Sequence, residues 1–84
     1  MHCSLVDVIE VEVLKNYELH LKFDDGSDGN IDISKVIPFK GIFAPLKDKS
    51  FFSRVTLRPE VGTICWENGA DLSPSFLREN IRKE

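Results

Sequence analysis

The chain of 84 residues has few of the residues from which metal centres are built: two histidines and two cysteines. A structural zinc site needs about four such ligands, usually in closely spaced pairs. His2 and Cys3 form the one close pair, so we expect no bound metal and no cofactor. Because no secretion signal is visible, Cys3 and Cys65 are expected to be free thiols rather than a disulfide.

Hydrophobic targeting segments are also missing. The opening residues, MHCSLVDVIEVEV, have no basic region and no small-residue cleavage site, so they do not have the pattern of a signal peptide. Their apolar residues alternate with acids, which excludes a membrane span in this stretch. We therefore expect a cytoplasmic protein that does not interact with membranes.

Positive charge is scarce, because the net charge is −3 and the isoelectric point is about 5.3. Broad electrostatic binding to nucleic acid needs a basic face, so we expect no nucleic-acid binding by this chain alone. Arg78, Arg82 and Lys83 are the only clustered cations, and we interpret them as one solvated helix face. The length and the 42% hydrophobic content indicate a single globular domain over residues 1–84.

The aspartate-rich segment DDGSDGNID was compared with a calcium-binding loop. With Asp24 in the first position, the third and twelfth positions are Gly26 and Lys35, which cannot supply the side-chain ligands needed there. We interpret the segment as a hairpin turn with solvated acids.

Alternation of apolar and polar residues predicts strands. The expected strands cover residues 6–13, 17–24, 29–33, 54–58 and 61–66. The alternation changes phase between Val8 and Ile9, which predicts either a bulge there or a first turn buried on both faces. Turns are expected at Asn16 and Gly26. Together with a helix near the C-terminus, the pattern predicts an α+β fold: a mostly antiparallel sheet of about five short strands, packed against a crossover segment and one C-terminal helix.

The crossover segment, residues 34–53, is very apolar for a connection. Its two prolines and lack of a strict period favour short helical turns, and one is predicted over residues 44–49 with Pro45 in its first position. Such a segment either covers the sheet or meets a partner. Because aromatic residues are typical binding anchors, the candidate interaction residues here are Phe39, Ile42, Phe43, Phe51 and Phe52.

The stretch ICWENGADLSPSF, residues 64–76, is expected to turn a strand into a helix. Trp66 should pack inward, and Asn68-Gly69 supplies the positive φ of a turn. Ser73 is a suitable N-cap, because proline follows it in the first helical position. Leu72, just before the cap, is expected to pack on the first helical turns.

The same stretch carries the remaining candidate site residues. Cys65 as a nucleophile would need a nearby base, and no histidine is close in sequence, so we interpret it as a small buried hydrophobe and expect no enzymatic activity. Asp71 is expected to accept backbone amides in the turn, and Glu67 to be exposed. Trp66, Glu67 and Asp71 are candidate interaction residues, and a ligand pocket formed by them with Cys65 is the alternative.

Three motifs carry a family resemblance: LKFDDGSDGNIDI, then GIFAPLKD followed by FFSRV, and GTICWENGADLSPSFL. With these motifs in this order, the chain resembles the bacterial family called domain of unknown function 2442. The residue after the tryptophan is often proline in that family, whereas it is Glu67 here. The resemblance implies a small cytoplasmic α+β domain with no established activity.

The resemblance also bears on partners. Some members carry an added helix-turn-helix domain, which this sequence lacks up to Glu84, so DNA binding is not carried over. Members are often encoded beside another small protein, in the manner of toxin–antitoxin pairs. We therefore expect an interaction module that binds a small protein encoded nearby, as the partner or neutralising half of such a pair, or that self-associates. A small ligand-binding or enzymatic domain around Trp66 and an accessory role in transcription regulation remain alternatives.

Overall fold

The structure of the protein is a computed structural model that describes residues 6–81. His2, Cys3, Arg82 and Lys83, which were considered as ligands or as part of a basic face, lie outside the described residues. The strands are β1 (Val8–Val13), β2 (Glu18–Phe23), β3 (Asp28–Asp32), β4 (Thr56–Arg58) and β5 (Thr63–Cys65). The helices are α1 (Ile33–Val36), the 3₁₀ helix η1 (Gly41–Lys47), α2 (Lys49–Phe52) and α3 (Pro74–Asn80). None of the helices in the described range is long and apolar enough to cross a membrane.

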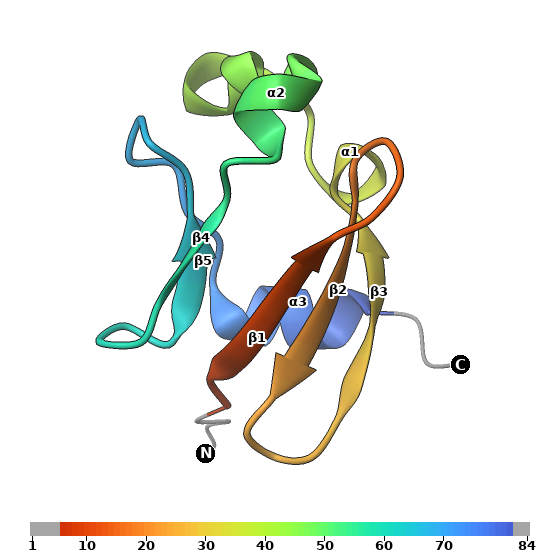
Figure 1. Ribbon diagram of the computed structural model, residues 1–84, viewed down its shortest axis with the longest axis vertical. Helices are drawn as coiled ribbons and strands as arrows, with labels where there is room; N and C mark the ends of the chain where they lie inside the picture. The colour runs from red at the N-terminus through yellow and green to blue at the C-terminus, as the bar shows by residue number, and fades with distance from the viewer. Residues whose placement is uncertain (1–5, 82–84) are drawn as a thin grey trace.

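The strands form two antiparallel sheets, in the orders β1-β2-β3 and β4-β5 (Figure 1). The α+β class, the five strands and the C-terminal helix are confirmed, but the strands are divided between two sheets instead of forming one. The sheets approach each other near the start of β1, where the Val8 N–H donates to the Gly62 carbonyl at 2.8 Å. This single hydrogen bond does not form a ladder between the two sheets. The three-residue strand β4 pairs with β5 alone.

The three-stranded sheet follows the predicted alternation closely. The register of β1 on β2 shifts between Val8 and Glu10, which confirms the bulge. Asn16 and Gly26 both adopt positive φ, at 57° and 89°, in the two turns where they were expected.

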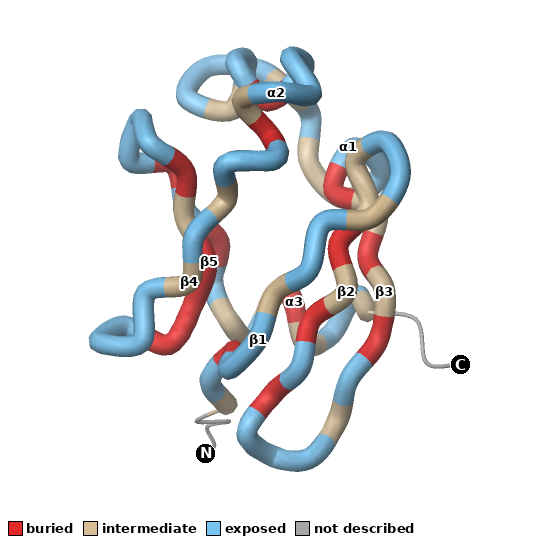
Figure 2. The backbone as a smooth tube through the Cα atoms, in the orientation of Figure 1, coloured by how far each residue is buried: buried red, intermediate tan, exposed pale blue. Residues whose placement is uncertain are grey.

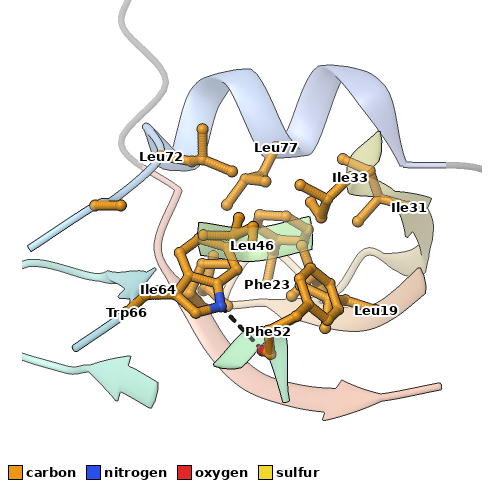
Figure 3. Close-up of a cluster of buried hydrophobic side chains, with 13 residues drawn as sticks. Leu19, Phe23, Ile31, Ile33, Leu46, Phe52, Ile64, Trp66, Leu72 and Leu77 are labelled. Carbon is orange, nitrogen blue, oxygen red and sulfur yellow. Dashed lines mark hydrogen bonds between the residues drawn. The ribbon is translucent and has the colours of Figure 1, made fainter. Parts of the chain in front are cut away.

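The core lies between the two sheets, with α3 behind them and the crossover segment closing one end (Figures 1 and 2). Figure 3 shows Trp66 and Phe52 at its centre, where the indole N–H donates to the Phe52 carbonyl at 2.9 Å. Because this bond satisfies the indole N–H, the large ring can be fully buried. The buried hydrophobic residues are Val8, Leu19, Leu21, Phe23, Ile31, Ile33, Leu46, Phe52, Ile64, Trp66, Ala70, Leu72 and Leu77.

The crossover segment is helical as expected, but with other bounds. The predicted turn over 44–49 is wrong, because η1 begins earlier, at Gly41, and places Pro45 in its interior. The helical path is then interrupted at Asp48, whose backbone is extended and whose side chain accepts the Ser50 N–H at 2.9 Å. This aspartate acts as an N-cap and starts α2 as a separate turn.

Candidate interaction site

The stretch after β5 folds back on itself before the helix begins. The Trp66 N–H donates to the Ala70 carbonyl at 2.9 Å, and the Gly69 N–H donates to the Trp66 carbonyl at 3.0 Å. Gly69 has a φ of 91°, which a residue with a side chain rarely adopts. Asp71 then bridges back to Cys65 in antiparallel fashion. The expected corner is therefore a tight hairpin, followed directly by α3.

The start of α3 was predicted correctly. The Ser73 side chain accepts the Phe76 N–H at 3.3 Å, and Pro74 occupies the first helical turn. Leu72 and Leu77, on the two sides of this cap, are both buried in the core and lie close together in Figure 3. This is the arrangement of a hydrophobic staple, which fixes the direction in which the chain enters the helix.

Asn68 connects the hairpin to the crossover segment. Its side-chain oxygen accepts the Ala70 N–H at 3.1 Å, and its side-chain N–H donates to the Ile42 carbonyl at 2.8 Å. In a 3₁₀ helix that carbonyl would receive the N–H of the residue three positions later, which here is Pro45 and has none. Asn68 thus supplies the donor that proline lacks.

Asn68 was not among the residues predicted to form the site, although a proline inside a helical segment signals a carbonyl that needs another donor. We expected Asp71 to accept backbone amides in the turn, and this expectation is wrong for the described residues. Asp71 is exposed, and the carbonyl of Asn68's side chain performs that role instead.

The candidate interaction residues fall into two groups by exposure. Phe52 and Trp66 are 0% and 2% exposed, so they are core residues that no partner can reach in this fold. Phe51 is partly buried and packs against the core. Ile42 is 51% exposed, and Phe39 and Phe43, near it in sequence, are partly exposed although they also contact the core. We call these three residues the crossover surface; Figure 2 shows the exposed chain around η1 and α2 that carries it.

The segment that carries the crossover surface is positively charged in an acidic protein. Residues 34–53 contain four lysines and one aspartate, a net charge of +3, whereas the whole chain has −3 and the remainder therefore −6. Lys40 and Lys47 occupy the two ends of η1 and are exposed. Lys49 lies 5.9 Å from the centre of the Tyr17 ring, and Phe39 packs edge-on against the same ring, at 5.1 Å between centroids. The Tyr17 ring therefore holds Phe39 in place, with Lys49 beside the same ring.

The other candidate residues line a shallow hollow on the second sheet. Its volume is about 220 Å³, and its lining residues are Arg58, Val61, Thr63, Cys65, Trp66, Glu67, Gly69 and Asp71. The Cys65 sulfur lies 3.7 Å from Arg58 Nη1 and 3.5 Å from Thr56 Oγ1. Glu67 is exposed, as expected, and pairs with Arg54 at 3.3 Å on the surface.

Arg58 is engaged mainly with Glu60, at 2.9 Å between Nε and Oε2. Its hydrogen bond to Glu60 raises the pKa of Arg58, and the pKa of Glu60 is lowered by a hydrogen bond from its own backbone and then by Arg58. The Glu60 carboxylate therefore already offsets part of the positive charge that Arg58 could offer to a ligand.

No histidine of residues 6–81 lines the hollow that contains the Cys65 thiol. His20 lies on the outer face of the other sheet, where its ring contacts Asn30 Oδ1 at 2.6 Å and Asp28 Oδ2 at 3.1 Å. Within residues 6–81, no three His, Cys, Asp or Glu side chains gather closely enough to hold a metal ion. Of the sequence candidates, the structure brings Cys65, Trp66, Glu67 and Asp71 together around the hollow and leaves Phe39, Ile42 and Phe43 on a separate surface.

Comparison with known proteins gives one result. No curated protein and no solved structure matches the chain. A family model described as "Protein of unknown function (DUF2442)" matches residues 8–83, which include every strand and helix described above and all three sequence motifs. Because the match covers nearly the whole chain, the protein belongs to this family of proteins of unknown function.

Proposed function

We propose that the protein is a protein-interaction module and that the crossover surface is its binding site. The observation that carries the proposal is the position of Ile42, a large apolar side chain that is half exposed on a short helix. Its carbonyl is held by Asn68, so the side chain is presented from a fixed backbone. A rigid apolar anchor loses little conformational entropy on binding, which is a property of interface hot spots.

The charge around Ile42 defines the partner. Lys40 and Lys47 lie at the two ends of the helix that carries Ile42, so the complementary surface is an apolar pocket with acidic residues at its rim. We propose as partner a small cytoplasmic protein encoded nearby, with the two proteins forming a pair in which one regulates or neutralises the other, as in toxin–antitoxin systems. The basis for this partner is the resemblance given above, in which members are often encoded beside another small protein; the matched family description itself names no partner.

Co-expression with the product of the adjacent gene tests the proposal. The wild-type chain and the Val61→Asp variant should co-elute with that protein at micromolar concentration, whereas Ile42→Asp should not. Val61 is a matched control because it is 58% exposed, on the β4–β5 turn away from η1. Separate elution of the wild-type proteins would contradict the proposal, and loss of binding in Val61→Asp alone would move the interface to the hollow.

The hollow supports a second candidate function, the binding of a small ligand. Its volume of about 220 Å³ lies below the roughly 300–1,000 Å³ of typical ligand sites, so only a small molecule would fit. Alkylation of Cys65 with iodoacetamide, in a Cys3→Ser background, would place a carboxamidomethyl group in part of it. The interaction proposal expects the alkylated protein to bind its partner unchanged, and loss of binding would favour the hollow.

A further inference from the structure

The outer edge of β1 is unpaired over its second half. The Leu14 N–H donates to the Glu18 carbonyl at 2.8 Å, so these two residues form a hydrogen-bonded pair across the hairpin. In an antiparallel ladder such pairs alternate, so Glu12 also bonds toward β2, while the backbones of Val11 and Val13 point away from it. Among residues 6–81, no backbone hydrogen bond engages Val11 or Val13 on that outer side.

The neighbouring sheet does not cover this part of the edge. Both β4 and β5 lie close to β1, but the backbone hydrogen bond between the sheets is at Val8, to Gly62, and the two sheets then diverge toward the end of β1 (Figure 1). Val13 remains 37% exposed although it lies opposite the fully buried Leu19. Val11 is partly buried against the core, so Val13 is the exposed valine of this edge. A strand edge with free N–H and C=O groups beside an exposed apolar residue is a template for pairing with another chain.

The outer face of the same edge is acidic. Glu10 and Glu12 lie opposite Lys22 and His20 of β2, and both glutamates are exposed. Neither takes part in an ion pair among the described residues. The edge therefore presents valines toward the core side and unneutralised carboxylates toward solvent, in strict alternation from Glu10 to Val13.

We infer that β1 accepts an extended segment of a partner protein in which apolar residues alternate with lysine or arginine. Such a segment adds a fourth strand to the sheet, and the backbone groups of Val11 and Val13 supply its hydrogen bonds. Its apolar residues extend the core side beside Val13, and its cations lie opposite Glu10 and Glu12. Opposite charges directly across a strand pair are stabilising. This edge is distinct from the crossover surface, and its role does not depend on the proposed function.

A second copy of the chain fits this edge poorly in the two registers that bring the glutamates together. Antiparallel pairing centred on Val11 places Glu10 of each copy opposite Glu12 of the other, and pairing centred on Glu12 places this residue opposite itself. Like charges opposite each other destabilise a strand pair. The two glutamates thus disfavour self-association in these registers and favour a basic strand.

A peptide probe tests the inference directly. A ten-residue peptide of alternating valine and lysine is titrated into the ¹⁵N-labelled protein, and amide hydrogen exchange is followed by NMR. We expect the amides of Val11 and Val13 to exchange at least about tenfold more slowly at saturation, because new hydrogen bonds protect them. A peptide of alternating valine and glutamate should give no protection, and higher salt should weaken binding of the lysine peptide.

Matched variants locate the charge effect. Glu12→Lys should weaken binding of the lysine peptide about fivefold, and Glu12→Gln should weaken it by less. Glu18→Lys changes the net charge by the same amount as Glu12→Lys, but it should not weaken binding because Glu18 lies on the central strand. Ile42→Asp should also bind the peptide normally, which separates this test from that of the crossover surface. Absence of protection at millimolar peptide, equal protection by the glutamate peptide, or protection at β3 instead of β1 would each overturn the inference.

Discussion

The contact between Asn68 and Ile42 allows a sharp test of how the structure is held together. Asn68→Asp keeps the side-chain oxygen that accepts the Ala70 N–H at 3.1 Å, but replaces the N–H that donates to the Ile42 carbonyl at 2.8 Å. A net contribution of about 1 kcal/mol is typical for one such bond, and the new contact between two acceptor oxygens adds to the loss. We expect the free energy of unfolding to fall by about 1–2 kcal/mol, and Tm by about 5–10 °C for a domain of this size.

The role of Pro45 supplies the second half of the test. Pro45→Ala introduces an N–H three residues after Ile42, so the carbonyl gains a donor within the helix. In that background Asn68→Asp should cost less, with a coupling free energy of about 0.5–1 kcal/mol between the two positions. Pro45→Ala alone costs about 0.4–1 kcal/mol, because the unfolded chain gains freedom, and the double-mutant cycle removes this term.

Urea denaturation of the four proteins, followed by far-UV circular dichroism and by the fluorescence of Trp66, measures the cycle. The two signals should give the same midpoint if unfolding is two-state. An equal cost of Asn68→Asp in both backgrounds would refute the proposed replacement of the proline N–H. A cost below about 0.3 kcal/mol in the wild-type background would show that the contact does not stabilise the fold.

Three further predictions concern stability. Trp66→Phe should lower the free energy of unfolding, measured by urea denaturation, by about 2–3 kcal/mol. The substitution removes a hydrogen bond of about 1 kcal/mol to the Phe52 carbonyl and leaves a void. The Phe52 carbonyl keeps one donor, the Val55 N–H at 3.2 Å. Ser73→Ala should cost about 1 kcal/mol by the same method, because the N-cap of α3 is lost. Hydrogen bonds from Ser27 lower the pKa of Asp25 from 3.8 to about 2, so the stabilising effect of this carboxylate is present above pH 3.8 and is lost as the pH falls through 2. Asp25→Asn should therefore flatten the dependence of Tm on pH between these values.

Control variants separate these effects from general sensitivity to substitution. Glu67→Gln, next to the tryptophan, breaks only an exposed pair with Arg54 and should change stability by less than about 0.5 kcal/mol. Ser75→Ala lies in the first turn of α3 on an exposed position and should be equally mild. Trp66→Phe or Ser73→Ala with effects no larger than these controls would contradict the structural roles given above. A parallel pH dependence of Asp25→Asn and wild type would contradict the role of Asp25.

Several local features followed from the sequence because they depended on neighbouring residues. The alternation in β2, the phase change after Val8 and the pairing of Ser73 with Pro74 are short-range signals, and each was confirmed. The division into two sheets was not predictable in this way. It depends on where the crossover segment leads the chain after β3, and no local pattern encodes that path.

The candidate site was predictable only in part for the same reason. Phe52 and Ile42 belong to one aperiodic apolar segment, and nothing in their spacing tells which is buried. In the structure Phe52 lies in the core, whereas Ile42 is about half exposed to solvent. The bond that fixes Ile42 joins residues 26 positions apart. Such long-range contacts arise from packing, so the sequence indicated the segment but not the residues that form its surface.

NMR mapping tests most directly whether Ile42 and its neighbours form a protein-binding surface. The ¹⁵N-labelled protein is titrated with the unlabelled product of the adjacent gene, and amide shift changes are recorded for residues 6–81. We predict that the largest changes fall on residues 39–43 and on Asn68, whose side chain bonds to Ile42. Changes confined to the hollow around Cys65, or no changes at millimolar partner, would contradict a binding role for the crossover surface.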